Sequence, residues 1–206
     1  MSTRTAHPPL KKSEQKARTR EAILAAAARL LRERGIAGTN VADVMQAAGL
    51  TVGGFYAHFD SKEALIEASL HRCLGEWRGK LLGRPHDEPW PALLEAMLER
   101  YLSARHRDEP SGGCPLPAVA AEIALEGTGK HALGAELAAF TEWLQQGCQS
   151  EHQRAPRNAV LGSLALMLGG LVFARALRDT PMSDEFLRAC RSYGRAALQE
   201  MGETRT

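Results

Sequence analysis

Residues 39–62, TNVADVMQAAGLTVGGFYAHFDSK, decide the fold of the N-terminal part of this 206-residue chain. Asn40 is a favourable N-cap for a first helix, and Asp43 places a carboxylate in its positive first turn. Gly49 is expected to end that helix, because glycine enters the left-handed conformation without strain. Thr51 can cap a second helix through its hydroxyl group. The segment is therefore predicted to form a helix-turn-helix motif.

The second helix of this motif is expected to have one packed face and one bare face. Phe55 and Phe59 are four residues apart and share the face that packs on the domain core. Gly53 and Gly54 cost about 1 kcal/mol each in a helix interior relative to Ala, and close approach to a nucleic-acid backbone gives the pair a reason. Donors suited to phosphate surround it, although each taken singly is equally consistent with an ordinary surface position: Thr51, Tyr56, His58 and Lys62.

Charge is unevenly distributed along the chain. Residues 1–62 contain ten Lys and Arg and five Asp and Glu, and the remainder contains 16 basic and 19 acidic residues. The net charge of +2 thus combines a basic front with a mildly acidic body, which favours phosphate binding at one end of the molecule. Residues 1–12 include Pro8 and Pro9 and little apolar content, so they are expected to form a flexible basic arm.

The first third of the chain resembles the DNA-binding domain of the tetracycline-repressor (TetR) family of bacterial regulators. The similar residues are TREAILAAAARLLRERG at 19–35, GTN at 38–40, DV at 43–44, GLT at 49–51, Gly53, FY at 55–56, HF at 58–59, SK at 61–62 and Leu65. The resemblance implies that Thr39, Tyr56, His58 and Lys62 hold phosphates, and that the major groove is faced by Thr51, Val52, Gly53 and Gly54.

The chain departs from the commoner family pattern at three positions. Asn40 stands where Thr or Ser is usual, Met45 where Ala is frequent, and Val52 where a polar residue often reads bases. A methyl contact to thymine is the apolar substitute for hydrogen-bonded readout by Val52.

The resemblance also implies an all-α architecture and a mode of action. A three-helix DNA-binding domain at residues 13–62, with its motif at 40–59, would be joined by a long helix to a helical effector-binding and dimerisation domain at 63–206. Such a protein is expected to be a cytoplasmic homodimeric repressor. A small effector would release it from a palindromic operator in double-stranded DNA, and the long connecting helix would transmit the change.

Beyond the motif, apolar periodicity and turn residues predict one helix after another. The expected elements are a helix of about five turns from 60–63 to near Gly83, a helix over 91–105, a loop at 107–113, a helix from Pro115 to about Leu125, a long helix reaching Cys148, and two last helices from Asn158 to Arg178 and from Ser183.

The last two helices predict a dimer interface. Small residues recur every seven positions in the first of them, and an apolar stripe follows the second. One monomer offers few neighbours to cover a helix that is apolar on all sides, so an isologous four-helix bundle is expected, with a fully intramolecular core as the alternative. The interface candidates are Gly162, Gly169, Ala176, Phe186, Cys190, Tyr193 and Ala197.

Large or adaptable side chains on helices that should face one another are the candidates for a ligand pocket, and core packing is the alternative for each. An apolar or aromatic effector is expected. The candidates are Met97, Tyr101, Phe140, Trp143, Met167 and Phe173. Cys114 supports a second hypothesis. In the sequence GGCP at 112–115, a thiol on a flexible loop at a helix N-terminus would have a lowered pKa and could sense oxidants or electrophiles. The alternative is an inert residue before a proline.

Other classes of protein are disfavoured. The four cysteines form no C-x-x-C pair and the seven histidines form no metal-binding pair, so neither a metal nor another cofactor is expected. Catalytic and nucleotide-binding motifs are also missing, which disfavours an enzyme. A helical ligand carrier would need neither the glycine pair nor the basic front. The longest uncharged stretch, 159–174, is shorter than the ~20 residues that span a bilayer and is predicted to be a buried helix.

Overall fold

The computed structural model describes residues 12–82, 89–146 and 154–203, and confirms the predicted all-α class, because these residues form helices and no strand. Residues 1–11 of the predicted arm, and Cys148, lie outside the described residues. The elements are α1 (Lys12–Arg34), α2 (Val41–Ala47), the 3-10 helix η1 (Val52–Ala57), α3 (Lys62–Leu82), α4 (Trp90–Tyr101), α5 (Ala104–Asp108), the 3-10 turn η2 (Pro110–Gly112), α6 (Leu116–Glu126), α7 (Lys130–Gln146), α8 (Arg157–Ala176) and α9 (Pro181–Glu203).

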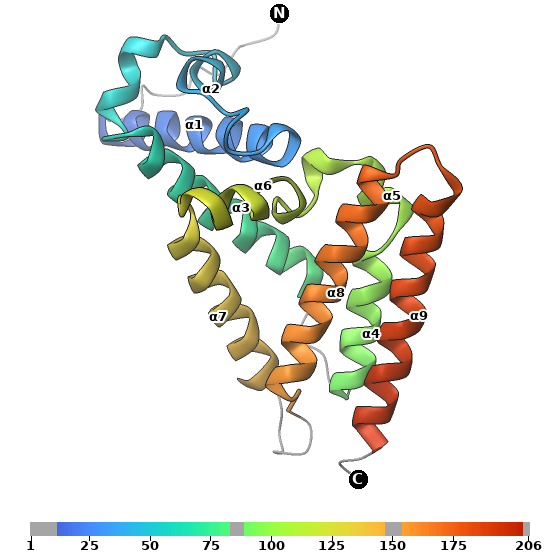
Figure 1. Cartoon of the computed structure of the whole chain (residues 1–206). Coiled ribbons are helices and arrows are strands. Elements are labelled where there is room, and N and C mark those ends of the chain that lie inside the picture. Colours follow the sequence, from blue (N-terminus) through green and yellow to red (C-terminus); the bar gives the residue numbers. More distant parts are fainter. Residues whose placement is uncertain (1–11, 83–88, 147–153, 204–206) are drawn as a thin grey trace, which may run out of the picture.

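The helices form a small head on a larger body (Figure 1). The head consists of α1, α2 and η1, and α3 runs from it down into the body. In the body, α4, α8 and α9 lie side by side, α7 packs against α3, and α6 lies between the head and the rest. The site predicted from sequence is therefore at one end of the molecule, away from the helices predicted to dimerise.

The head encloses its own small core. Ile23 and Ala27 of α1 are fully buried and contact Val44 of α2. Phe55 and Phe59 complete this core at 1% and 5% exposure, with their rings stacked 5.9 Å apart. The prediction that these two aromatic residues face the core is confirmed.

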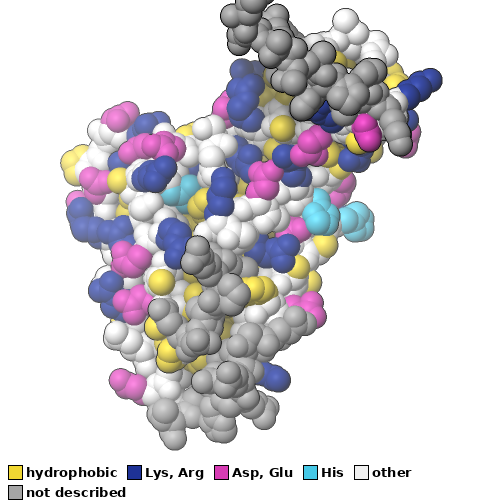
Figure 2. Space-filling model, turned by 180° about the vertical axis from the view of Figure 1, so that it is seen from behind, with side chains coloured by type: hydrophobic (Ala, Val, Ile, Leu, Met, Phe, Trp, Pro, Cys, Tyr) yellow, Lys and Arg dark blue, Asp and Glu magenta, His cyan; other side chains and the backbone are white. Residues whose placement is uncertain are grey.

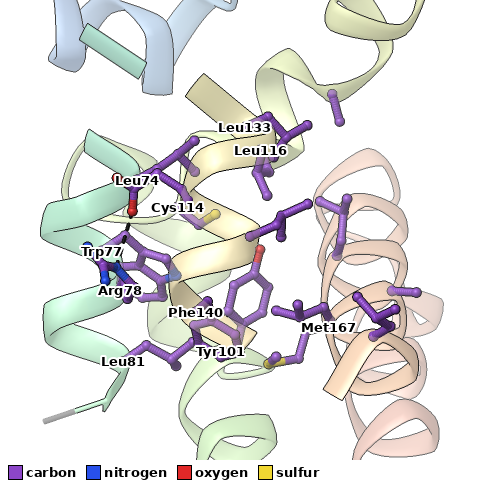
Figure 3. Close-up of a pocket in the computed structure, with 17 residues that line it drawn as sticks. Leu74, Trp77, Arg78, Leu81, Tyr101, Cys114, Leu116, Leu133, Phe140 and Met167 are labelled. Atoms are coloured by element: carbon purple, nitrogen blue, oxygen red, sulfur yellow. Dashed lines mark ion pairs between the residues drawn. The ribbon is translucent and has the colours of Figure 1, made fainter. Parts of the chain in front are cut away.

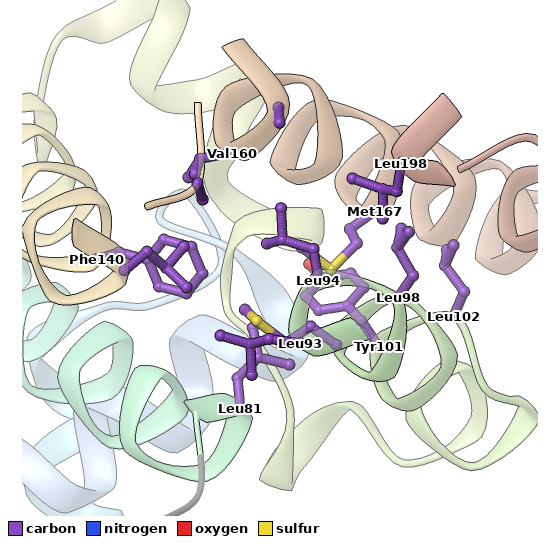
Figure 4. Close-up of a cluster of buried hydrophobic side chains, with 14 of the residues drawn as sticks. Leu81, Leu93, Leu94, Leu98, Tyr101, Leu102, Phe140, Val160, Met167 and Leu198 are labelled. Carbon is purple, nitrogen blue, oxygen red and sulfur yellow. The ribbon is translucent and has the colours of Figure 1, made fainter. Parts of the chain in front are cut away.

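The body has a separate core between α4, α8 and α9. Figure 4 shows Leu94 and Leu98 of α4 meeting Met167 of α8 and Leu198 of α9. Leu94, Leu98 and Met167 are at most 1% exposed. Burying a Leu or Met side chain contributes about 1.5–3 kcal/mol, so this cluster stabilises the body.

Two glycines let the body helices approach closely. A Cβ added at Gly170 of α8 would stand 2.8 Å from both Cys190 Sγ and Leu102 Cδ2, and one at Gly194 of α9 would stand 2.7 Å from Leu98 Cδ1. Gly162 and Gly169 have no such neighbour within 4 Å. Close packing inside the protomer thus uses glycines other than the two singled out in the sequence.

Two predicted helix boundaries differ in the structure. The helix expected over 91–105 breaks after Tyr101, because Ser103 accepts a hydrogen bond from His106 N at 3.2 Å and starts α5. The final helix begins at Pro181, and Ser183 does not cap it: its hydroxyl donates to Ala174 O at 2.6 Å and ties α9 to α8. The start of α3 lies within the predicted range of 60–63, and its cap is Ser61, whose Oγ accepts from Ala64 N at 3.1 Å.

Helix α8 is long and apolar enough to cross a membrane by length and composition alone. In the structure it packs against α9, α4 and α6 instead. Its residues Val160, Met167 and Leu171 belong to the body core. Leu161, Val172 and Phe173 are exposed, so the helix that was predicted to be buried over 159–174 is buried on one side only.

A carboxylate on α6 holds the head on the body. Glu122 accepts hydrogen bonds from Ile36 N at 2.6 Å and Ala37 N at 2.9 Å, in the turn that follows α1. The guanidinium of Arg32, buried at 8% exposure, donates to Glu76 of α3 at 2.9 Å. Charge-assisted bonds of this kind are about twice as strong as neutral ones, so the head is attached to both α3 and α6.

Candidate nucleic-acid interface and internal cavity

The turn between the two helices of the motif has the predicted caps. Asn40 Oδ1 accepts from Asp43 N at 2.8 Å, and Asn40 Nδ2 donates to Asp43 Oδ2 at 3.0 Å. Gly49 follows α2 with a φ of 72°, the left-handed conformation that only glycine adopts freely. Leu50 N then donates to Met45 O at 2.8 Å, which closes the turn. The predicted capping by Asn40 and termination at Gly49 are both confirmed.

The second helix of the motif is shorter and tighter than predicted. It is a 3-10 helix of six residues, and Thr51 makes no side-chain cap hydrogen bond. The predicted hydroxyl cap at Thr51 is therefore wrong. Two consecutive glycines lower the propensity for an α-helix, and 3-10 helices are usually short segments such as this one.

The outer edge of η1 is bare. A Cβ added at Gly53 would meet nothing within 4 Å, and one at Gly54 would make only an ordinary contact, 3.8 Å from Met45 Cε. Neither residue has a positive φ that would require glycine. The fold itself therefore gives no reason for this pair, and a partner that approaches the backbone closely does.

The predicted phosphate ligands around this edge differ in accessibility. Tyr56 is 74% exposed, Thr51 is also exposed, and Val52 is 49% exposed beside them. His58 and Lys62 are half-buried. The Nδ1 atom of His58 is buried without a hydrogen-bond partner among the described residues.

The prediction that Thr39 holds a phosphate is wrong. Its side chain is 1% exposed, and its hydroxyl donates to Gly35 O at 2.6 Å, across the turn that follows α1. A group placed in this way stabilises the turn and is not available to an external phosphate.

Arg20 is a further candidate phosphate ligand that the motif did not indicate, because it lies on α1. Its guanidinium stands 4.8 Å from the centre of the Phe59 ring and brings an exposed cation to the head.

The body contains a cavity of about 270 Å³ between α3, α4, α6, α7 and α8 (Figure 3). Four of the predicted ligand-binding residues line it: Tyr101, Cys114, Phe140 and Met167. The remaining lining is mostly aliphatic and includes Leu116 and Ala120 of α6, the helix that carries Glu122.

Three predicted pocket residues lie elsewhere. Met97 is fully buried in the core between α4 and its neighbours, and Trp143 packs against the same core without lining the cavity. Phe173 is 53% exposed and stacks on Phe186 at 4.8 Å, on the outer side of α8 and α9. The lining residues that the sequence pattern did not indicate lie on α3, α6, α7 and α8: Leu74, Trp77, Arg78, Leu81, Leu116, Ala120, Leu133, Glu136, Leu137, Leu161, Leu164, Ala165 and Leu168.

Cys114 does not have the surroundings that the sensor hypothesis required. Its side chain is 2% exposed and faces the cavity rather than a flexible loop. Burial raises the pKa of the Cys114 thiol, although a hydrogen bond with Tyr101 acts in the opposite direction. The expected lowered pKa is wrong, because the apolar walls disfavour the thiolate more than the helix N-terminus stabilises it.

His106 holds the segment that carries Cys114. Its Nδ1 lies 2.8 Å from Tyr101 O, and its Nε2 accepts from Cys114 N at 3.0 Å, which places the proton of the neutral ring on Nδ1. Burial, with a smaller contribution from the charge of Arg175, lowers the pKa of His106 to about 4. The ring is therefore neutral near pH 7.

The outer faces of α8 and α9 differ in character. Ion pairs cover the side of α9 next to α4, where Arg195 reaches Glu95 at 2.5 Å and Glu99 at 2.8 Å, and Figure 2 shows acidic and basic side chains alternating over this side of the body. The other side carries small and apolar residues, including Tyr193 at 70% exposure. These are Gly162, Gly169, Ala176, Phe186, Tyr193 and Ala197, at exposed or half-buried positions.

Cys190, one of the predicted interface residues, has its side chain turned into the protomer. Its side chain points back toward α8, because a Cβ at Gly170 would stand 2.8 Å from its Sγ atom. It packs against the body core and thus serves the protomer itself.

Comparisons with known proteins agree on one class. The family described as "Bacterial regulatory proteins, tetR family" matches residues 23–69. The "HTH-type transcriptional repressor KstR2" of Rhodococcus jostii is 40% identical over 73 residues, which are 35% of this chain and 36% of that protein. An uncharacterised HTH-type transcriptional regulator of Mycobacterium tuberculosis, MT0206, is 27% identical over 88% of this chain and 96% of its own length.

A solved structure shares the arrangement of helices. The crystal structure of a TetR transcriptional regulator from Chloroflexus aurantiacus superposes with a TM-score of 0.71 at 26% identity, covering 90% of this chain and 96% of that one. The chain spans less than half the length of the first two curated relatives it matches, at 47% and 36%. The relatives and the structure named here are regulators, none an enzyme.

The neutral His106 predicts a pH dependence of stability. Because the folded pKa of about 4 lies below the unfolded value of about 6.5, the stability that His106 contributes is present above pH 6.5 and is lost as pH falls toward 4. Within this window the slope from one group is at most about 1.4 kcal/mol per pH unit. Urea unfolding of His106→Asn between pH 4 and 8 should show a shallower dependence than the wild type. His131→Asn, at an exposed position of α7, is the control, and parallel curves for all three proteins would contradict the assignment.

Proposed function

Since the chain belongs to the TetR family of DNA-binding transcriptional regulators, we propose that it is a cytoplasmic homodimeric repressor that a small effector releases from a palindromic operator. The observation that carries this proposal is the bare edge at Gly53 and Gly54, which the protein's own packing leaves without an explanation. The edge would lie in the major groove of double-stranded DNA.

The side chains around this edge would make two kinds of contact with DNA, to phosphates and to bases. Tyr56, His58, Lys62 and Thr51 would contact phosphates and fix the register on the duplex without reading sequence. The exposed side chain of Val52 would contribute a methyl contact to thymine, since it offers no hydrogen bond.

A dimer would set the spacing of two such edges. One six-residue helix contacts few base pairs, whereas two in register reach half-sites about one helical turn, ~34–36 Å, apart. The apolar outer side of α8 and α9 supports an isologous four-helix bundle, because its glycines are open and Tyr193 is largely exposed.

The effector would act through α6 as well as α3. One end of α6 lines the cavity through Leu116 and Ala120, and Glu122 on the same helix binds the turn just before α2. A ligand that displaces α6 would therefore shift the head, and so change the separation of the two edges in the dimer. The connecting helix α3 alone was expected to transmit the change.

The bare edge predicts opposite effects of one substitution on folding and on binding. Gly53→Ala should leave the melting temperature unchanged or raised, because the methyl group meets nothing in the protein. Its affinity for an operator selected from random duplexes by the wild-type protein should fall by about tenfold or more, since the methyl group would stand against DNA.

Gly134→Ala on α7 is the matched control, because that position is equally open and is far from the head in sequence. It should bind the operator like the wild type. Wild-type affinity in Gly53→Ala would show that DNA does not approach this backbone.

The proposed dimer predicts the effect of a charge at Tyr193. Tyr193→Asp should convert a dimer to a monomer in analytical ultracentrifugation, because the interface would have to bury an unpaired carboxylate. Operator affinity should fall with it, as the second half-site contact is lost. Arg188→Asp changes the charge more, on the side of α9 that carries Arg191, and should remain dimeric. A monomeric wild-type protein would refute the proposal.

The role of α6 is tested at Glu122. Glu122→Gln keeps the shape of the side chain but cannot accept from both amides, so hydrogen exchange at Ile36 and Ala37 should accelerate. Operator affinity should change as well, although the motif is intact. Glu126→Gln, at the exposed end of α6, should alter neither. Faster exchange with unchanged operator affinity would show that this contact does not position the head.

A further inference from the structure

The charges on the cavity wall cancel. Among the described lining residues the charged ones are Arg78 and Glu136, and Arg78 Nε lies 3.1 Å from Glu136 Oε2. The other carboxylate oxygen of Glu136 lies 3.0 Å from His71 Nδ1. Figure 3 marks the pair at the α3 side of the cavity. A charged ligand would therefore meet no unpaired counter-charge while losing its hydration.

The Tyr101 hydroxyl is also occupied. It shares a hydrogen bond with the Cys114 thiol, and Figure 3 shows it pointing toward the part of the cavity where Cys114 and Leu116 lie. Both side chains are almost fully buried, at 4% and 2% exposure. They satisfy each other and leave no strong donor open to a ligand.

Outside the Arg78–Glu136 ion pair, Trp77 carries a neutral donor without a partner among the described lining groups. Its indole Nε1 is buried and has no hydrogen-bond partner among the described residues. The ring is held in place by stacking on His106 at 4.5 Å and by an edge contact with Tyr101 at 5.8 Å. A fixed, buried N–H without an acceptor is unfavourable, so an acceptor brought by a ligand would be favoured there.

We propose that the cavity binds a compact, uncharged and largely apolar molecule that carries one hydrogen-bond acceptor, such as a ketone oxygen, and that Trp77 Nε1 donates to it. This deepens the effector-binding part of the proposed function by naming the ligand class and its polar anchor. The volume of about 270 Å³ lies near the lower limit of ~300 Å³ for drug-sized ligands, which favours one or two rings.

The proposal is tested with three probes of similar size. These are 1-tetralone, which has a ketone oxygen, tetralin, which lacks it, and the anion 1-naphthoate. Calorimetry or thermal-shift titration on the full chain without DNA should show 1-tetralone binding about tenfold more tightly than tetralin, the effect of one hydrogen bond to a previously unpaired donor. 1-Naphthoate should bind most weakly.

Trp77→Phe keeps an aromatic ring against His106 and removes the N–H group. It should bind tetralin like the wild type and lose the preference for 1-tetralone. Trp90→Phe, in the body core outside the cavity, should keep that preference. An unchanged preference in Trp77→Phe, tighter binding of 1-naphthoate, or no binding of any probe would overturn the proposal.

Because these measurements contain no DNA, they separate the two proposals. Ketone-selective binding in a protein that has no affinity for DNA would leave the ligand class standing and refute the proposed function. Operator binding with no preference for the ketone would refute the ligand class and leave the proposed function standing.

Discussion

The contact between the head and α6 links the DNA-binding motif to the body of the molecule. Glu122 accepts two backbone hydrogen bonds, from Ile36 and Ala37, at the point where the chain turns from α1 toward the helix-turn-helix motif. Together with the buried apolar cluster that Leu31 and Ile36 share with Val119 and Ile123 of α6, this carboxylate holds the head in its orientation relative to the body. Since α6 also lines the cavity, the position of the bare edge and the shape of the cavity depend on one helix.

Glycine has three separate uses in this chain, and only the packing around each distinguishes them. Gly49 has a positive φ and ends α2. Gly170 and Gly194 admit side chains of neighbouring helices within the protomer. Gly53 meets neither condition, so its explanation lies outside the protomer. A glycine without a local reason is a physical argument for a partner at that position.

The cavity shows how a nearly apolar site acquires selectivity. Its charged residues pair with each other, and Tyr101 pairs with Cys114, so most polar atoms on the wall are unavailable. In the proposed binding mode, selectivity comes from the indole N–H of Trp77, whose ring is fixed by contacts with His106 and Tyr101. His106 in turn stays neutral because burial lowers its pKa, and it also holds Cys114 N.

The helical class, the caps at Asn40 and Gly49, and the inward faces of Phe55 and Phe59 could be predicted from the sequence, because they follow from local propensity and periodicity. Which groups remain accessible could not be predicted in this way, because accessibility depends on how the helices pack. Thr39 was buried by a bond to Gly35, Cys114 by the walls of the cavity, and Phe173 was turned outward, while Trp77 was brought to the cavity by the packing of α3 on α7. Burial and contact depend on which helices meet, and residues distant in sequence settle that.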